Sequence, residues 1–213
     1  MPLAAGSGYS LRMLFLASRS PRRQQLLAQL GYRFAVLDVE VPEQRLEGES
    51  CLDYVRRVAR EKAGAGLLQV AAVPGAVVIG ADTEVVLEDT VFGKPTSAEE
   101  AAAMLRRLSG REHEVISVVW AVSAGGERCA VCRSRVRFAP LSEALIEAYV
   151  ATGEPFGKAG AYAVQGRAAA FIEWLAGSYS GVMGLPLHET AGLLAACGLP
   201  PLASWKETGS ASA

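Results

Sequence analysis

The chain has few of the residues on which several common kinds of site depend. It contains only two histidines, His113 and His188, which are too isolated for a histidine metal site or a serine triad. Among its four cysteines, only Cys129 and Cys132 have a suggestive spacing, and no second pair completes a zinc site. Both fall in a predicted strand, where residues three apart face opposite sides, and we interpret them as structural.

Long hydrophobic runs and a charge excess are also missing. No apolar segment approaches the length of a membrane span, and the run 13–17 is too short for the core of a signal peptide. We therefore expect a cytoplasmic protein without a membrane partner. The net charge of −1 provides no bulk attraction for nucleic acid, so any anion binding must be local.

The composition is that of a folded protein, with 51% hydrophobic and 20% charged residues in a chain of 213. We predict an unstructured extension at 1–12, a single domain at 13–200 and a flexible tail at 201–213. Hydrophobic periodicity and turn signals then divide the domain into elements. Strands are predicted at 13–17, 32–37, 76–80, 113–123, 128–138, 159–166 and 169–175, with a further strand and turn within 81–95. Helices are predicted at 21–30, from 50 onward, and at 97–110, 142–150 and 185–197. This mixture indicates an α/β or α+β fold.

The start of the first helix has an unusual charge. Ser20 is a good N-cap and Pro21 suits the first helical position, yet Arg22 and Arg23 occupy the turn where acidic side chains are preferred. One interpretation is that an anion binds there, between the free backbone N–H groups and the arginines. The other is a pair of solvated arginines, and this stretch alone does not separate the two.

Polar residues follow the ends of predicted strands, where parallel sheets place their ligand sites. Asp82 and Thr83 come after the apolar run 76–80, and Gln165 comes after "GAYAV". A buried aspartate is costly unless it is paired, metal-bound or catalytic. The ordinary alternative is an aspartate that caps a turn through its own backbone.

Lys62, Lys94 and Glu43 each have an ordinary interpretation as a solvated charge. Together with the two arginines and the aspartate, however, they form the inventory that a triphosphate-cleaving site requires: cations for the phosphates, and carboxylates for a metal or a base.

Six motifs resemble, in order and spacing, those of the Maf family of nucleoside triphosphate pyrophosphatases. They are "LASRSPRRQQLL", "REKA", "GADT", "GKP", "KAGAYAVQG" and "GSYSGVMGLPLHE", spread from about Met13 to about Cys197. The resemblance implies hydrolysis of a nucleoside triphosphate to its monophosphate and pyrophosphate with a divalent cation, Mg²⁺ or Mn²⁺. It also implies a homodimer and an α/β fold of the Maf/Ham1 (ITPase-like) type, in which helices flank an elongated mixed sheet and a cleft separates two lobes.

Within that family, Arg22, Thr83 and Gln165 stand where the subgroup specific for dTTP and UTP has the same residues. The subgroup that acts on 7-methyl-GTP usually carries a bulky aromatic in place of the arginine. An amide offers both a donor and an acceptor to a pyrimidine edge, which agrees with the first subgroup.

The resemblance also suggests roles. Asp82 is the candidate general base, alone or while binding the metal, and Glu43 is the candidate second metal ligand. The predicted substrate-binding residues are Ser18, Ser20, Arg22, Arg23, Lys62, Thr83, Lys94 and Gln165. Two alternatives stay open: a nucleotide-binding regulator of septum formation and cell-division arrest without turnover, and a house-cleaning hydrolase of modified pyrimidine nucleotides.

Overall fold

The computed structural model describes residues 12–201, and most of the predicted extension 1–12 and tail 201–213 lies outside the described residues. The described chain forms a mixed sheet in the order β2-β1-β3-β5-β6-β7, with β4 paired to β3 alone. The strands are β1 (Met13–Ala17), β2 (Phe34–Leu37), β3 (Ala76–Leu87), β4 (Thr90–Phe92), β5 (Glu112–Ser123), β6 (Gly126–Phe138) and β7 (Ile172–Ala176). The helices are α1 (Pro21–Gln29), α2 (Cys51–Gln69), α3 (Ala98–Leu108), α4 (Glu143–Ala151), α5 (Tyr179–Met183) and α6 (Leu187–Ala196).

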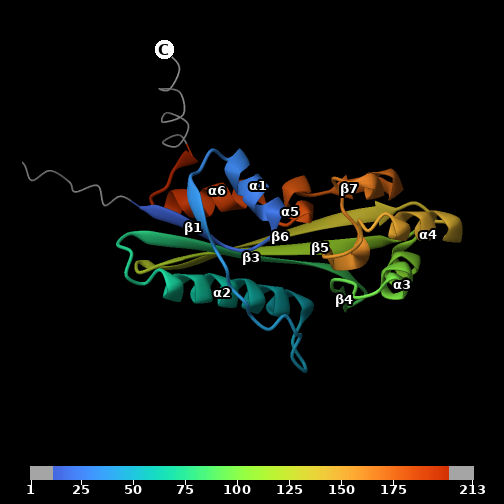
Figure 1. Ribbon diagram of the computed structural model, residues 1–213, viewed down its shortest axis with the longest axis horizontal. Helices are drawn as coiled ribbons and strands as arrows, with labels where there is room; N and C mark the ends of the chain where they lie inside the picture. The colour runs from blue at the N-terminus through green and yellow to red at the C-terminus, as the bar shows by residue number, and fades with distance from the viewer. Residues whose placement is uncertain (1–11, 202–213) are drawn as a thin grey trace, which may run out of the picture.

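The sheet is elongated and its two faces carry different helices (Figure 1). Helix α2 runs along one face, while α1, α5 and α6 cover part of the other, and α3 and α4 lie at one end of the long strands. The prediction of a mixed α/β fold is confirmed. Within the described residues, no helix is both long enough and apolar enough to cross a membrane.

The sheet changes from parallel to antiparallel pairing at β3. Strand β1 pairs with it in parallel only as far as Ile79, whereas β5 pairs with it in antiparallel register from Val77 to Val86. We expected Asp82 to follow a strand that ends near Gly80, and that boundary was wrong because the antiparallel partner carries β3 onward. Asp82 therefore lies within β3, just past the carboxyl end of its neighbour β1.

The prediction of a strand at 159–166 was also wrong. Gly160 and Ala161 have positive φ angles of 68° and 60°, which break an extended conformation, and a short 3₁₀ turn (Ala159–Ala161) forms instead. The alternating apolar residues there fill a core rather than pair with a strand. The predicted strand 169–175 is half correct, because a 3₁₀ helix (Arg167–Phe171) precedes β7.

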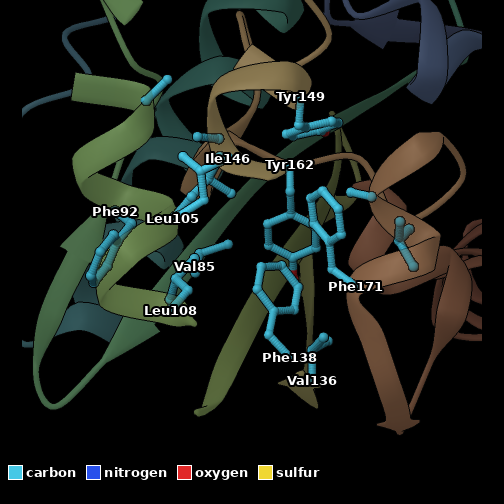
Figure 2. Packing of buried hydrophobic residues seen from close by; sticks show 14 of the residues in the cluster. Val85, Phe92, Leu105, Leu108, Val136, Phe138, Ile146, Tyr149, Tyr162 and Phe171 are labelled. Atoms are coloured by element: carbon cyan, nitrogen blue, oxygen red, sulfur yellow. The ribbon is translucent and has the colours of Figure 1, made fainter. Parts of the chain in front are cut away.

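A group of aromatic side chains with edge-to-face contacts lies in the hydrophobic core beside the carboxyl end of β6 (Figure 2). Phe138 packs against Tyr162 with ring centroids 4.8 Å apart, and Tyr149 against Phe171 at 4.9 Å. His113 joins this cluster through a 2.9 Å hydrogen bond between its Nε2 and the hydroxyl of Tyr162. Since Tyr162 lines the cavity described below, the cluster supports one wall of the site.

The buried imidazole of His113 should make the free energy of unfolding depend on pH in the acid range. Burial lowers the pKa of its imidazole to about 4, so the folded protein keeps it neutral where an unfolded chain would protonate it. The free energy of unfolding should therefore fall as the pH drops from about 6.5 to 4. The substitution His113→Gln should reduce this decrease in the free energy of unfolding by about 2 kcal/mol between pH 6.5 and 4.5. Urea unfolding at several pH values measures this, with His188→Gln at an exposed position as the control; an equal slope in both variants contradicts it.

Candidate active site

The predicted site residues come together in one cavity of about 390 Å³. They come from four parts of the chain: the β1–α1 connection with the first turn of α1, the loop before α2 with α2 itself, β3 with the segment after β4, and the region after α4. The predicted residues that line the cavity are Ser18, Ser20, Arg22, Arg23, Glu43, Lys62, Asp82, Thr83, Lys94 and Gln165. The expected cleft is thus present, with the N-terminal end of α1 on one side and residues 157–165 on the other.

The N-terminus of α1 forms the cationic end of this cavity. Ser20 caps the helix by accepting a hydrogen bond from the backbone N–H of Arg23, Pro21 is the first helical residue, and no acidic side chain occupies the first turn. The hydroxyl of Ser18 accepts from the backbone N–H of Ser20 at 3.2 Å. The helix dipole and both arginines therefore point positive charge at the same space.

The two arginines are held differently. Arg23 donates from Nε to the carbonyl of Gly184 at 2.8 Å and from Nη2 to the hydroxyl of Thr83 at 3.4 Å. Burial lowers its pKa, and the charges of three nearby carboxylates work in the opposite direction. The pKa of Arg22 is also lowered, first by burial and then by Arg23. Neither guanidinium forms a salt bridge among the residues that the structure describes, so both are available to an anion.

A short polar chain fixes Thr83 beside Arg23. Its hydroxyl lies 2.7 Å from that of Ser117 on β5, which in turn donates to the carbonyl of Gly181 at 2.7 Å. The motif segment 177–187 contains the short helix α5. Its carbonyls at Gly181 and Gly184 orient the threonine and the arginine, so this segment supports the site directly.

The opposite side of the cavity is a lysine–carboxylate network. Lys62 Nζ lies 2.7 Å from Asp82 Oδ1 and 2.6 Å from Glu43 Oε1, while Lys94 Nζ lies 2.5 Å from Glu43 Oε2. Lys62 is 7% exposed and Asp82 4% exposed, so the pair that they form is buried. Burial alone would raise the pKa of Glu43, but the charges and hydrogen bonds of the two lysines outweigh it and lower that pKa to about 2.

A glycine on β3 permits this pairing. A Cβ added at Gly80 would lie 2.4 Å from the backbone nitrogen of Ala63 and 2.6 Å from the carbonyl oxygen of Ala59, both on α2. Only glycine allows the helix to approach the strand this closely. The close approach brings the ammonium of Lys62 within 2.7 Å of the carboxylate of Asp82, which lies two residues after Gly80 on the strand.

Sequence reasoning missed two charged groups, one buried beside this network and one on the cavity wall. Glu84 points to the same face of β3 as Asp82, is 4% exposed, and has an Oε2 atom without a hydrogen-bond partner in the described chain. Burial and the charge of Asp82 raise its pKa to about 8. The sequence signal for Glu84 was its position two residues after Asp82, since residues two apart in a strand face the same side. Lys158 lines the cavity and was not singled out either.

The carboxylates suit a hard divalent cation, although not as a complete protein cage. Within the described residues, no three histidine, cysteine or acidic groups are arranged to hold a metal by themselves. Asp82 nevertheless keeps its buried Oδ2 without a partner, directed away from the lysine bond at Oδ1. Mg²⁺ is commonly held by one or two carboxylates together with substrate phosphates and water, and Asp82 and Glu43 fit that pattern.

Comparison with known proteins gives one family and a set of similar chains. The family model described as Maf-like protein matches residues 13–197. A protein of Xanthomonas euvesicatoria pv. vesicatoria named dTTP/UTP pyrophosphatase is 57% identical over 188 residues, which cover 87% of this chain and 99% of that one. A protein of Xylella fastidiosa named nucleoside triphosphate pyrophosphatase is 57% identical over 184 residues, covering 86% and 97%. The solved structure of the Staphylococcus aureus Ham1 protein aligns with a TM-score of 0.41 and 13% identity, over 60% of this chain and 72% of that one.

Proposed function

Because the chain belongs to the Maf family, we propose that it is a hydrolase that converts dTTP and UTP to their monophosphates and pyrophosphate. One observation carries the proposal: a single cavity joins a cationic helix start, with no acidic residue in its first turn, to a buried aspartate whose Oδ2 has no hydrogen-bond partner in the described chain. The first feature suits a triphosphate and the second suits activation of water. The names of the similar Xanthomonas and Xylella proteins agree with this assignment.

In the proposed reaction, a water oxygen forms a bond to the α-phosphorus while the bond from that phosphorus to the α,β-bridging oxygen breaks. Asp82 Oδ2 takes the proton of the water, and the electron pair of the broken bond leaves with pyrophosphate. Lys62 donates to Oδ1 of the same carboxylate, and this bond fixes the orientation in which Oδ2 would meet the water. Arg22, Arg23 and Lys94 stabilise the charge that develops on the phosphate oxygens.

Asp82 and Glu43 would hold the divalent cation, which would neutralise part of the triphosphate charge and help to orient the α-phosphate. On the base side, Gln165 is exposed at the cavity. Its amide would donate to and accept from the edge of a pyrimidine. We also propose, from the family resemblance, that the protein acts as a cytoplasmic homodimer.

The test is pyrophosphate release from a panel of natural and modified nucleoside triphosphates with Mg²⁺ or Mn²⁺. We expect dTTP and UTP to exceed the purine nucleotides in kcat/KM by at least about tenfold, the discrimination that ~1.4 kcal/mol supplies. Activity should disappear with EDTA and return with the cation. Higher kcat/KM for modified pyrimidines would support the house-cleaning alternative. Tight nucleotide binding without release from any member of the panel would overturn the proposal in favour of a regulator without turnover.

A further inference from the structure

The residue that would recognise the base lies on an irregular segment. Gln165 stands between the short 3₁₀ turn (Ala159–Ala161) and the 3₁₀ helix (Arg167–Phe171), outside the sheet. An irregular backbone has fewer neighbours to fix it than a strand has, so its N–H groups need partners elsewhere. The position of the amide in the cavity depends on those partners.

A turn bond from the backbone N–H of Gly166 to the carbonyl of Ala163, at 3.0 Å, closes the segment locally, and one carboxylate supplies two further partners. Glu154 Oε2 accepts from the backbone N–H of Arg167 at 3.1 Å, and its Oε1 accepts from that of Ala168 at 3.3 Å. Oε1 also accepts from the hydroxyl of Tyr149 at 2.9 Å, and this hydroxyl accepts from the backbone N–H of Ala163 at 3.3 Å. The segment carrying the glutamine is therefore bound on both sides through a single side chain and its tyrosine partner.

The contact is so close that a side chain at position 166 would displace the carboxylate. A Cβ added at Gly166, next to the glutamine, would lie 2.3 Å from Glu154 Oε1. The carboxylate therefore lies directly against the backbone of this position. Burial would raise the pKa of Glu154, but the hydrogen bonds from the backbone and Tyr149 outweigh it and lower that pKa. The group is thus an anionic acceptor, which strengthens each bond that it receives.

The tyrosine that bonds to this carboxylate belongs to the buried hydrophobic cluster. Tyr149 is 3% exposed and packs edge-to-face on Phe171, as Figure 2 shows. The threonine hydroxyl of Thr152 accepts from the backbone N–H of Glu154 at 3.1 Å. Lys158, which lines the cavity, donates to the carbonyl of Glu154 at 2.5 Å. The same short stretch therefore holds the glutamine segment and builds the cavity wall beside it.

We propose that Glu154 is a positioning residue for base recognition, which holds the backbone around Gln165 so that its amide meets the pyrimidine edge. This inference rests on the proposed function. Within the part of the chain that the structure describes, Glu154 forms no hydrogen bond or ion pair with Arg22, Arg23 or Lys94. Its replacement should therefore change recognition of the base and leave the hydrolytic step nearly intact.

The experiment is a double-mutant cycle on the full chain with Glu154→Gln and Gln165→Ala, using dTTP and GTP. Glu154→Gln keeps the size of the side chain but replaces one acceptor oxygen with a donor, so one of the backbone bonds is lost. We expect KM for dTTP to rise about tenfold with kcat within about threefold, and the preference for dTTP over GTP to fall by about the same factor. In the Gln165→Ala background, Glu154→Gln should have little further effect on that preference. Glu147→Gln, at an exposed position on α4, the helix that precedes Glu154, is the matched control.

Tyr149→Phe provides a second route should Glu154→Gln fail to fold. It removes one bond from each side of the anchor and should raise KM for dTTP about threefold with kcat unchanged. A preference for dTTP that survives these variants overturns the inference, as do effects of Glu154→Gln and Gln165→Ala that multiply. A loss of kcat in place of the KM change would also overturn it. A wild-type protein without pyrimidine preference overturns the proposed function itself, and this inference with it.

Discussion

The Asp82→Asn variant is expected to lose hydrolysis of dTTP and UTP by roughly 10²- to 10⁴-fold in kcat, the range that general bases contribute. Asparagine has nearly the same shape as aspartate and can still accept one bond from Lys62. It cannot take a proton from water, however, and its second terminal atom is no longer an anionic oxygen. Pyrophosphate release under saturating substrate measures kcat, and equilibrium nucleotide binding measures whether the cavity remains intact.

A titration with the cation separates the roles of this carboxylate. If the carboxylate acts only as the base, Asp82→Asn should not recover at high Mg²⁺ or Mn²⁺. A variant that lacks a metal ligand should recover as the cation concentration rises. Asp89→Asn, at an exposed turn with a positive φ that asparagine tolerates, is the matched control. Unchanged kcat in the Asp82 variant would contradict the mechanism, whatever the protein binds.

Local signals in the sequence predicted most of the fold. The serines expected to begin helices do so: Ser20, Ser50, Ser97 and Ser142 each accept a hydrogen bond from a backbone N–H in the first turn. The long strands predicted at 113–123 and 128–138 are present as β5 and β6, which pair in antiparallel register around a glycine turn. Caps and alternation act over a few residues, which is why a single sequence reveals them.

Errors arose where distant segments decide the local structure. The end of β3 depends on β5, whose register with it no local pattern specifies. Apolar alternation at 159–166 reflects burial in the aromatic cluster rather than strand pairing. The predicted site residues do share one cavity, but their pairing was beyond the sequence. That Lys62 bridges Asp82 and Glu43, and that Glu84 shares their surroundings, depends on the packing of α2 against β3.

Removal of the lysine that bridges two carboxylates should cause the largest loss of stability. Lys62→Met keeps the aliphatic stem but leaves Asp82 and Glu43 without their common cation, and a broken buried pair typically costs about 3–5 kcal/mol. Urea unfolding at pH 7 measures the free energy of unfolding. Lys94→Met is the matched control, because that ammonium also binds Glu43 but its side chain is 52% exposed. Loss of such an exposed pair should cost about 1 kcal/mol or less.

The origin of the loss can be tested by removing the uncompensated charge. If a buried anion causes it, Asp82→Asn should restore part of the stability when combined with Lys62→Met, so the two substitutions will not be additive. Additive effects would instead show that the stability is lost through packing.

The pH dependence of stability gives a second test. The pKa of Glu43 is about 2, because the charges and hydrogen bonds of the two lysines outweigh its burial. Its ionised form therefore stabilises the fold above pH 4.5, and this contribution is lost as the pH falls toward 2. Without Lys62 that pKa must rise, and the gain in stability between pH 2 and 4.5 must shrink. Two carboxylates held close together and largely out of water need a cation between them, and Lys62 is the residue placed to supply it.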